Sequence, residues 1–111
     1  MIDIEKIRTE IVDSLMPLNS DKIILFGSYA YGNPTEESDI DLFLLKNDLK
    51  LESLREYRIT ARSQLRKLIL KYKIGFDILS GPTDYINKRE DYFYKIDVLK
   101  NGKVLYEQNG S

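Results

Sequence analysis

The sequence predicts an α/β (α+β) fold in which a small mixed β-sheet is flanked by helices. Short apolar runs typical of buried strands alternate with longer stretches whose apolar residues recur every three or four positions, as on one face of a helix. The chain has 111 residues, the usual size for one hydrophobic core. We therefore expect residues 1–111 to form a single domain.

Helical periodicity predicts one helix over residues 3–16 and a longer one over residues 51–72. Pro17 and Asn19 follow the first helix and predict its end. The apolar positions of the first helix are Ile4, Ile7, Ile11 and Leu15, and those of the second are Leu54, Tyr57, Ala61, Leu65, Leu68 and Tyr72. The apolar face of the long helix should pack on the sheet.

Strands are predicted over residues 22–26, 39–45 and 74–79, the last closed by a Gly-Pro pair. A short capped helix is expected over residues 83–88. Residues 96–106 fit either a helix that stops at glycine before a short strand, or a hairpin turned by Asn-Gly; we favour the first.

The amino-acid composition excludes several classes of function. Lys and Arg total 17 against 18 Asp and Glu, and a net charge of −1 argues against direct nucleic-acid binding or membrane binding through bulk charge. Without His or Cys, the available chemistry is that of carboxylates, hydroxyls and basic side chains. The acidic start and the absence of a long apolar run predict a cytoplasmic protein.

A pair of aspartates is the first candidate site. On a strand, Asp39 and Asp41 point to the same face at a Cα separation of about 6.5 Å. No Lys or Arg occurs in residues 23–45, and two carboxylates this close repel by about 1 to 4 kcal/mol unless a cation binds. Magnesium, which prefers oxygen ligands, fits this position. The alternative is that the pair simply marks the solvent face of a strand.

Two further features support the site. Gly27 and Ser28 lie where an apolar strand meets a helix-competent stretch, so helix amides and a hydroxyl could bind an anion; a plain serine N-cap is the alternative. Asp77 is the single ionisable residue of the third strand. If that strand neighbours Asp41, three carboxylates converge and suit two metal ions, or one metal and a general base. The alternative is an edge-strand Asp facing water.

The order of these motifs resembles the minimal nucleotidyltransferase family of the DNA polymerase beta superfamily. The resemblance is carried by residues 27–32 (Gly-Ser-Tyr-Ala-Tyr-Gly), 38–42 (Ser-Asp-Ile-Asp-Leu) and 76–79 (Phe-Asp-Ile-Leu), and continues through residues 101–107. It implies a polymerase beta-like nucleotidyltransferase fold and magnesium-dependent transfer of AMP from ATP to an acceptor hydroxyl.

The resemblance also implies a role for each motif residue. Gly27 and Ser28 would hold the triphosphate, and Asp39 and Asp41 would bind two magnesium ions. Asp77 would ligate the second ion or deprotonate the acceptor. The family often has basic residues just after Gly-Ser, whereas this chain has tyrosines at positions 29 and 31.

The acceptor implied by the family is a HEPN-type toxin, bound in a hetero-oligomer in which the small protein acts as an antitoxin by adding AMP. One alternative is a catalytically weak or inactive binding module that neutralises its partner by occlusion. Another is a nucleotidyltransferase that modifies a small molecule or RNA. A nuclease-type Asp-X-Asp enzyme fits less well, because it does not predict Gly-Ser upstream.

A further feature of the sequence is a stripe of four arginines on the long helix. Arg55, Arg58, Arg62 and Arg66 fall within about 80° around the long helix, beside its apolar face. They predict either a solvated flank that covers apolar surface or a contact with an acidic partner or a phosphate chain.

Overall fold

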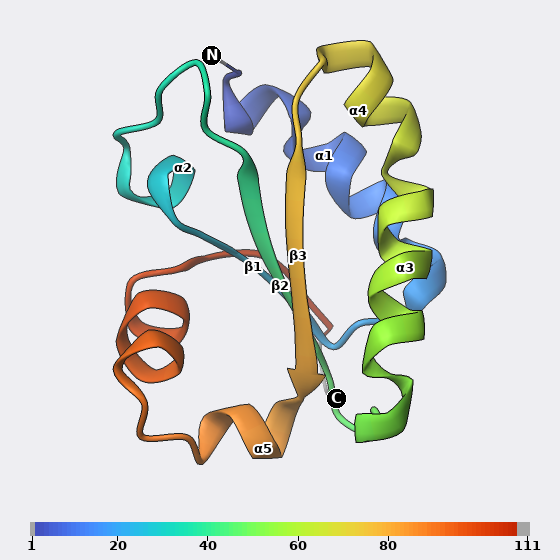
Figure 1. Ribbon diagram of the computed structural model, residues 1–111, viewed down its shortest axis with the longest axis vertical. Helices are drawn as coiled ribbons and strands as arrows, with labels where there is room; N and C mark the ends of the chain where they lie inside the picture. The colour runs from blue at the N-terminus through green and yellow to red at the C-terminus, as the bar shows by residue number, and fades with distance from the viewer. Residues whose placement is uncertain (1, 109–111) are drawn as a thin grey trace.

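The computed structural model describes residues 2–108, which form a four-stranded sheet with helices on both faces (Figure 1). Strand β1 pairs antiparallel with β2 and with β4, whereas β2 and β3 run parallel, so the predicted mixed sheet is confirmed. In spatial order the strands are β3 (Phe76–Pro82), β2 (Ile40–Lys46), β1 (Lys22–Phe26) and β4 (Lys103–Glu107).

Three helices cover one face of the sheet and form the larger part of the core. They are α1 (Ile4–Leu15), α3 (Leu54–Gln64) and α4 (Arg66–Tyr72). Their buried side chains recur at the predicted spacing and meet alternate residues of the strands. The main members of this cluster are Ile7, Ile11, Leu15, Ala61, Leu65 and Leu68 from the helices, and Ile23, Leu25, Ile40, Leu42 and Leu44 from the strands.

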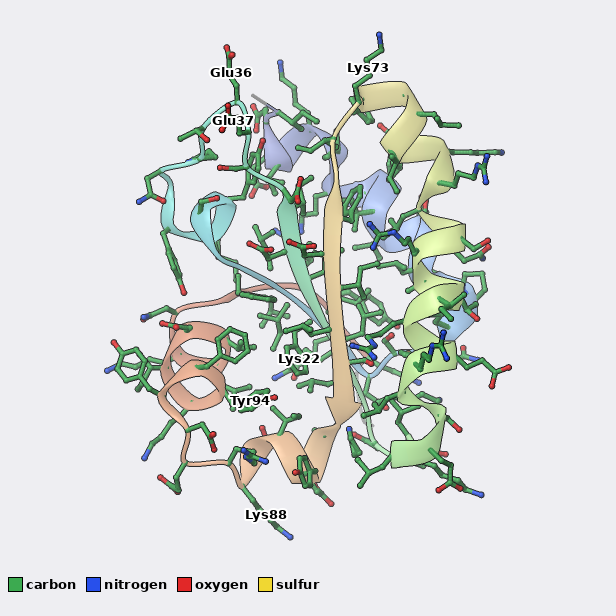
Figure 2. The ribbon with its side chains drawn as sticks, in the orientation of Figure 1. Lys22, Glu36, Glu37, Lys73, Lys88 and Tyr94 are labelled. Carbon is green, nitrogen blue, oxygen red and sulfur yellow. The ribbon has the colours of Figure 1, made fainter. Side chains whose placement is uncertain are left out.

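The other face carries α5 (Thr83–Asn87) and the π-helix η3 (Phe93–Lys100). The ring of Tyr94, which points from η3 toward the sheet in Figure 2, lies edge-on to Phe43 with 5.9 Å between ring centroids. This cluster packs on the later residues of β2, including Phe43 and Leu45. It anchors η3 to the sheet.

Short helical turns connect the larger elements. They are η1 (Met16–Leu18), α2 (Ser28–Tyr31) and η2 (Leu51–Ser53). No helix among residues 2–108 has both the length and the apolar character needed to cross a membrane.

The prediction of one continuous helix over residues 51–72 is wrong. The structure divides it into η2, α3 and α4, with a break at Leu65 whose backbone has φ −87° and ψ −2°. The N–H of Leu65 is shared between the carbonyls of Ala61 and Arg62. Because Ala61, Leu65 and Leu68 are all buried, the break keeps both halves packed on the sheet.

Other boundaries also differ. Strand β3 continues through Gly81 and Pro82, because these residues pair with Leu45 and Lys46 at an outer edge where the missing N–H of proline is tolerated. Strand β2 begins at Ile40, so Asp39 precedes it. Helix α5 forms, but the expected cap does not: Pro82 makes no capping bond, and the buried Thr83 hydroxyl has no partner within the described residues.

The end of the chain follows the favoured prediction of helix, glycine and strand. Gly102 connects η3 to β4, and its N–H donates to Val98 O at 3.1 Å. A Cβ atom here would lie 2.2 Å from that carbonyl oxygen and 2.5 Å from Ile24 Cγ2. Backbone lies on one side and the core on the other, so neither neighbour can move away easily.

We predict that Gly102→Ala lowers the free energy of unfolding by about 1 to 3 kcal/mol, because the added methyl overpacks this turn. Chemical denaturation measures the change. Asn101→Ala is the control: Asn101 is exposed, and its change should stay within about 0.5 kcal/mol. Equal stability of Gly102→Ala and the native chain would contradict the contact.

Candidate active site

The sheet brings the predicted aspartates to one end. Asp41 and Asp77 are the second residues of β2 and β3, and the parallel register places them directly opposite each other. Asp39 lies just before β2, where Ile40 N–H donates to Gly75 O at 2.9 Å. The expectation that the third strand neighbours the second is therefore confirmed.

Gly27 makes room for one of these carboxylates. It follows β1 with φ +75° and ψ −159°, a conformation that side-chain-bearing residues rarely adopt. A Cβ atom at this position would lie 2.0 Å from Asp41 Oδ2. Glycine is thus required both by the backbone and by the carboxylate that lies against it.

A second glycine has a similar role that the sequence analysis did not identify. A Cβ atom on Gly75 would lie 2.5 Å from Asp39 Oδ1. The only signal in the sequence is a glycine at the start of the third apolar run, one residue ahead of Phe76. Its significance depends on the pairing of β2 with β3, which local sequence does not reveal.

Ser28 begins α2, as predicted. Ala30 and Tyr31 both donate their N–H groups to Gly27 O, at 3.0 and 3.1 Å. A helix start leaves the amides of its first residues without partners inside the helix. The Gly-Ser turn therefore presents Ser28 and the first amides of α2 beside the end of β1.

The carboxylates strain the site electrostatically. The pKa of Asp41 is raised from 3.8 to about 6, first by burial, then by the negative charges of Asp77 and Asp39, and by a hydrogen bond with Asp77. None of the ion pairs among residues 2–108 involves these three side chains. Among the described residues, no Lys or Arg therefore forms an ion pair with this cluster, and residues 23–45 contain neither residue type.

A divalent cation fits the chemistry of this donor set. Among residues 2–108, no three Asp or Glu side chains are grouped closely enough to hold one ion as they stand. Asp41 and Asp77 nevertheless lie opposite each other, and a cation would offset the negative charges of Asp77 and Asp39, which after burial contribute to the raised pKa of Asp41. Carboxylate oxygens are the ligands that magnesium prefers.

The two tyrosines that replace basic residues have different surroundings. Tyr29, a residue of α2, is buried in the core. Tyr31 is 46% exposed and donates its hydroxyl to Asp97 O at 3.1 Å, which joins α2 to η3. Its pKa is raised by burial first, then by the charge of Asp97, with smaller contributions from Tyr92 and Asp41. Neither ring supplies positive charge.

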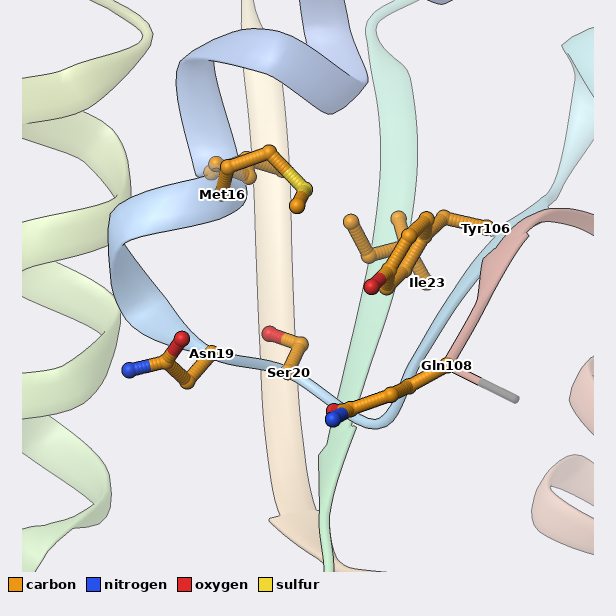
Figure 3. A pocket seen from close by; sticks show the side chains of 7 residues that line it. Met16, Asn19, Ser20, Ile23, Tyr106 and Gln108 are labelled. Carbon is orange, nitrogen blue, oxygen red and sulfur yellow. The ribbon is translucent and has the colours of Figure 1, made fainter. Parts of the chain in front are cut away.

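A hollow of about 140 Å³ lies beside Asp39, between the loop after α2 and the end of α4. Figure 2 shows Glu36 and Glu37 in that loop, and Lys73 at the same end of the molecule. A separate hollow of about 160 Å³, seen in Figure 3, lies at the opposite end of β1, and no carboxylate lines it. Of the two, the first is lined by one of the three aspartates, Asp39.

Carboxylate oxygens beside a helix start suit the chemistry of enzymes that transfer a phosphorus group. The model of the family described as "Polymerase beta, Nucleotidyltransferase" matches residues 9–111. This chain therefore belongs to the polymerase beta nucleotidyltransferase family, as its motifs predict.

Two relatives come from Methanocaldococcus jannaschii. The chain is 38% identical over 85 residues to "Putative protein adenylyltransferase MJ0604", with 77% of each chain covered. It is 30% identical over 100 residues to "Putative protein adenylyltransferase MJ0141", which covers 83% of this chain and 94% of that one.

Solved structures share the fold. A mutant toxin-antitoxin complex named MntA-HpeT matches with a TM-score of 0.59 at 21% identity. A toxin-antitoxin structure with AMP-PNP matches with a TM-score of 0.61 at 23% identity. Both matches cover 92% of this chain and 74% of the other.

We predict that Asp41→Asn stabilises the metal-free protein at pH 8. Because the native carboxyl, with its pKa near 6, binds a proton more tightly than the unfolded one at 3.8, native stability falls as pH rises through this window and stays lower above it. Asn has no charge to desolvate, so the variant avoids this loss.

Thermal unfolding in EDTA at several pH values measures the effect. The advantage of Asp41→Asn should be full above pH 6 and disappear near pH 4. Asp84→Asn, a change at an exposed aspartate of α5, is the control and should show no such dependence. A variant less stable than the native chain at pH 8 would contradict the electrostatic strain.

Proposed function

We propose that this protein is a magnesium-dependent protein adenylyltransferase that transfers AMP from ATP to a hydroxyl of a HEPN-type toxin and thereby acts as its antitoxin in the cytoplasm. The observation that carries the proposal is the Asp41 carboxylate lying against Gly27 and opposite Asp77. Family membership, the adenylyltransferase names of the relatives, and the toxin-antitoxin structures of the same fold all support it.

The proposed substrate geometry follows from the residues around the turn. Gly27 and Ser28 would bind the triphosphate, because the start of α2 offers amide N–H groups and a hydroxyl. Asp39 and Asp41 would hold two magnesium ions, with Asp77 as a ligand of the second or as the base. Bound magnesium would neutralise the phosphate oxygens and bring the attacking and leaving oxygens into line.

The remaining steps are the transfer of the phosphorus group and of a proton, and the protein's own carboxylates receive the proton. The acceptor hydroxyl forms a bond to the α-phosphorus, the bond to pyrophosphate breaks, and the hydroxyl proton passes to a carboxylate. Asp77 is suited by its position to receive that proton, because its side chain is exposed where an acceptor can reach it. Its strand, β3, lies at an edge of the sheet, which leaves space for a partner's side chain to approach.

The experiment is a mass measurement. A partner captured from host lysate is incubated with ATP and magnesium, and its intact mass is compared for the native chain and Asp39→Ala/Asp41→Ala. We expect a gain of whole AMP groups with the native chain alone. Asp13→Ala/Asp84→Ala, which removes two exposed aspartates elsewhere, should retain the gain.

A stable complex without any gain in mass would contradict adenylyl transfer and favour neutralisation by occlusion. A gain that survives in Asp39→Ala/Asp41→Ala would contradict the assignment of these carboxylates. Supplying small molecules or RNA in place of the captured protein tests the other acceptors.

Gly27→Ala tests the contact at the centre of the site. The methyl group would displace the Asp41 carboxylate, and we expect AMP transfer to fall by about 100-fold or more, since misplacement by about 1 Å has effects of this size. Gly32→Ala is a matched control, because Gly32 also has positive φ (+82°) but has nothing within 4 Å of a Cβ atom.

Both substitutions therefore strain the backbone, and one alone disturbs the carboxylate. Initial rates of AMP incorporation, measured for variants with equal folded fractions, separate the two effects. Equal loss of activity in both variants would show that backbone strain, and not the contact with Asp41, limits the reaction.

A further inference from the structure

A broad hollow of about 440 Å³ lies on the outer surface of α3 and α4, across the break at Leu65. Figure 1 shows these helices on the side of the sheet away from α5 and η3. The hollow is therefore separate from Asp41 and Asp77, which alternation along β2 and β3 places on the same face of the sheet as the η3 cluster. Its lining residues are Ile59, Arg62, Ser63, Arg66, Ile69 and Leu70.

The floor of this hollow is apolar. Ile59 is 58% exposed and Leu70 is 66% exposed, which is unusual for two large aliphatic side chains that line one depression. Neither belongs to the core clusters, whereas Ala61, Leu65 and Leu68 on the inner face are buried. The helices thus have an apolar inner face that packs on the sheet and a second, uncovered apolar surface.

The rim of the hollow is positively charged. Arg62 and Arg66 line it, and Arg55 and Arg58 extend the same stripe toward the start of α3. None of the ion pairs described for residues 2–108 includes any of the four. An apolar centre bordered by arginine is the composition of a protein interface, in which arginine and large apolar residues are enriched.

We propose that this hollow binds an amphipathic helix of a protein partner, with aliphatic side chains on Ile59 and Leu70 and carboxylates opposite the arginine stripe. The lining spans residues 59–70, a length of about 16 Å along a helix axis, which matches about three turns of a partner helix. The proposal rests on the proposed function only in taking the partner to be a protein.

Two other occupants fit less well. A second copy that used the same face would bring Arg62 and Arg66 against their own equivalents and place like charges together. A phosphate chain would satisfy the arginines but leave the exposed aliphatic floor without a partner, since backbone contacts to nucleic acids are polar and charged. An acidic amphipathic helix satisfies both features at once.

This arrangement would hold a partner without occupying the nucleotide site. The docked helix contacts α3 and α4, while the partner's acceptor reaches the carboxylates from the other side of β3, the edge strand. Binding and chemistry would then depend on different residues. Each can be removed while the other remains.

Titration of the ¹⁵N-labelled full chain, without nucleotide or metal, tests the proposal. The probes are a helical peptide with leucines on one face flanked by glutamates, the same peptide with lysines for the glutamates, and a single-stranded oligothymidylate. We expect the acidic peptide alone to bind, with amide shifts confined to α3 and α4.

Matched variants test the two halves of the surface. Arg62→Glu/Arg66→Glu should weaken binding of the acidic peptide at least tenfold, whereas Lys6→Glu/Lys67→Glu makes the same charge change at exposed positions outside the hollow and should not. For the apolar floor, Leu70→Ser should weaken binding, and Leu51→Ser, at a residue 59% exposed on η2, should not.

Several results would overturn the proposal: no binding of the acidic peptide at α3 and α4, equal binding of the lysine peptide, binding of the oligothymidylate there, or shifts at these residues that depend on protein concentration alone. The last two would indicate a phosphate chain or a second copy. Asp39→Ala/Asp41→Ala should bind the peptide like the native chain, so failure of the transferase proposal leaves this test intact.

Discussion

The approach of the Asp41 carboxylate to the backbone of Gly27 is the contact on which the site depends. Any side chain at position 27 would occupy the space of Asp41 Oδ2. Antiparallel pairing places Phe26 opposite Asp41, so Gly27 follows directly beyond that pair, and parallel pairing places Asp77 on the other side. This contact therefore joins the end of β1 and the start of α2 to β2, and the pairing of β2 with β3 adds the beginning of a further strand.

The core maintains this cluster against its own repulsion. Strand β2 lies between β3 and β1, and its side chains from Leu42 to Leu45 are buried in the two apolar clusters. This packing fixes the strand that carries Asp41 even though burial and neighbouring charges raise the pKa of that carboxyl. Native proteins often accept such local strain at functional sites, where a binding partner relieves it.

The two faces of the sheet have different consequences for function. The face under α1, α3 and α4 is fully occupied by packing, so these helices contribute stability, and their outer surface is available for other contacts. The opposite face is covered by η3 and α5 near Phe43, while the aspartates lie beyond that cluster. The hydroxyl of Tyr31 joins α2 to η3 across this boundary, which makes a tyrosine at that position a structural tie.

The sequence by itself determined the elements and the candidate residues, because both depend on local properties. The spacing of Ile7, Ile11 and Leu15 specifies a helix face, and the Gly-Ser pair after an apolar run specifies a strand that ends in a turn. The tertiary structure alone decided the strand order, the break at Leu65, and the pairing of each aspartate with its glycine. These features arise from contacts between segments far apart in the chain, where packing and register outweigh local preference.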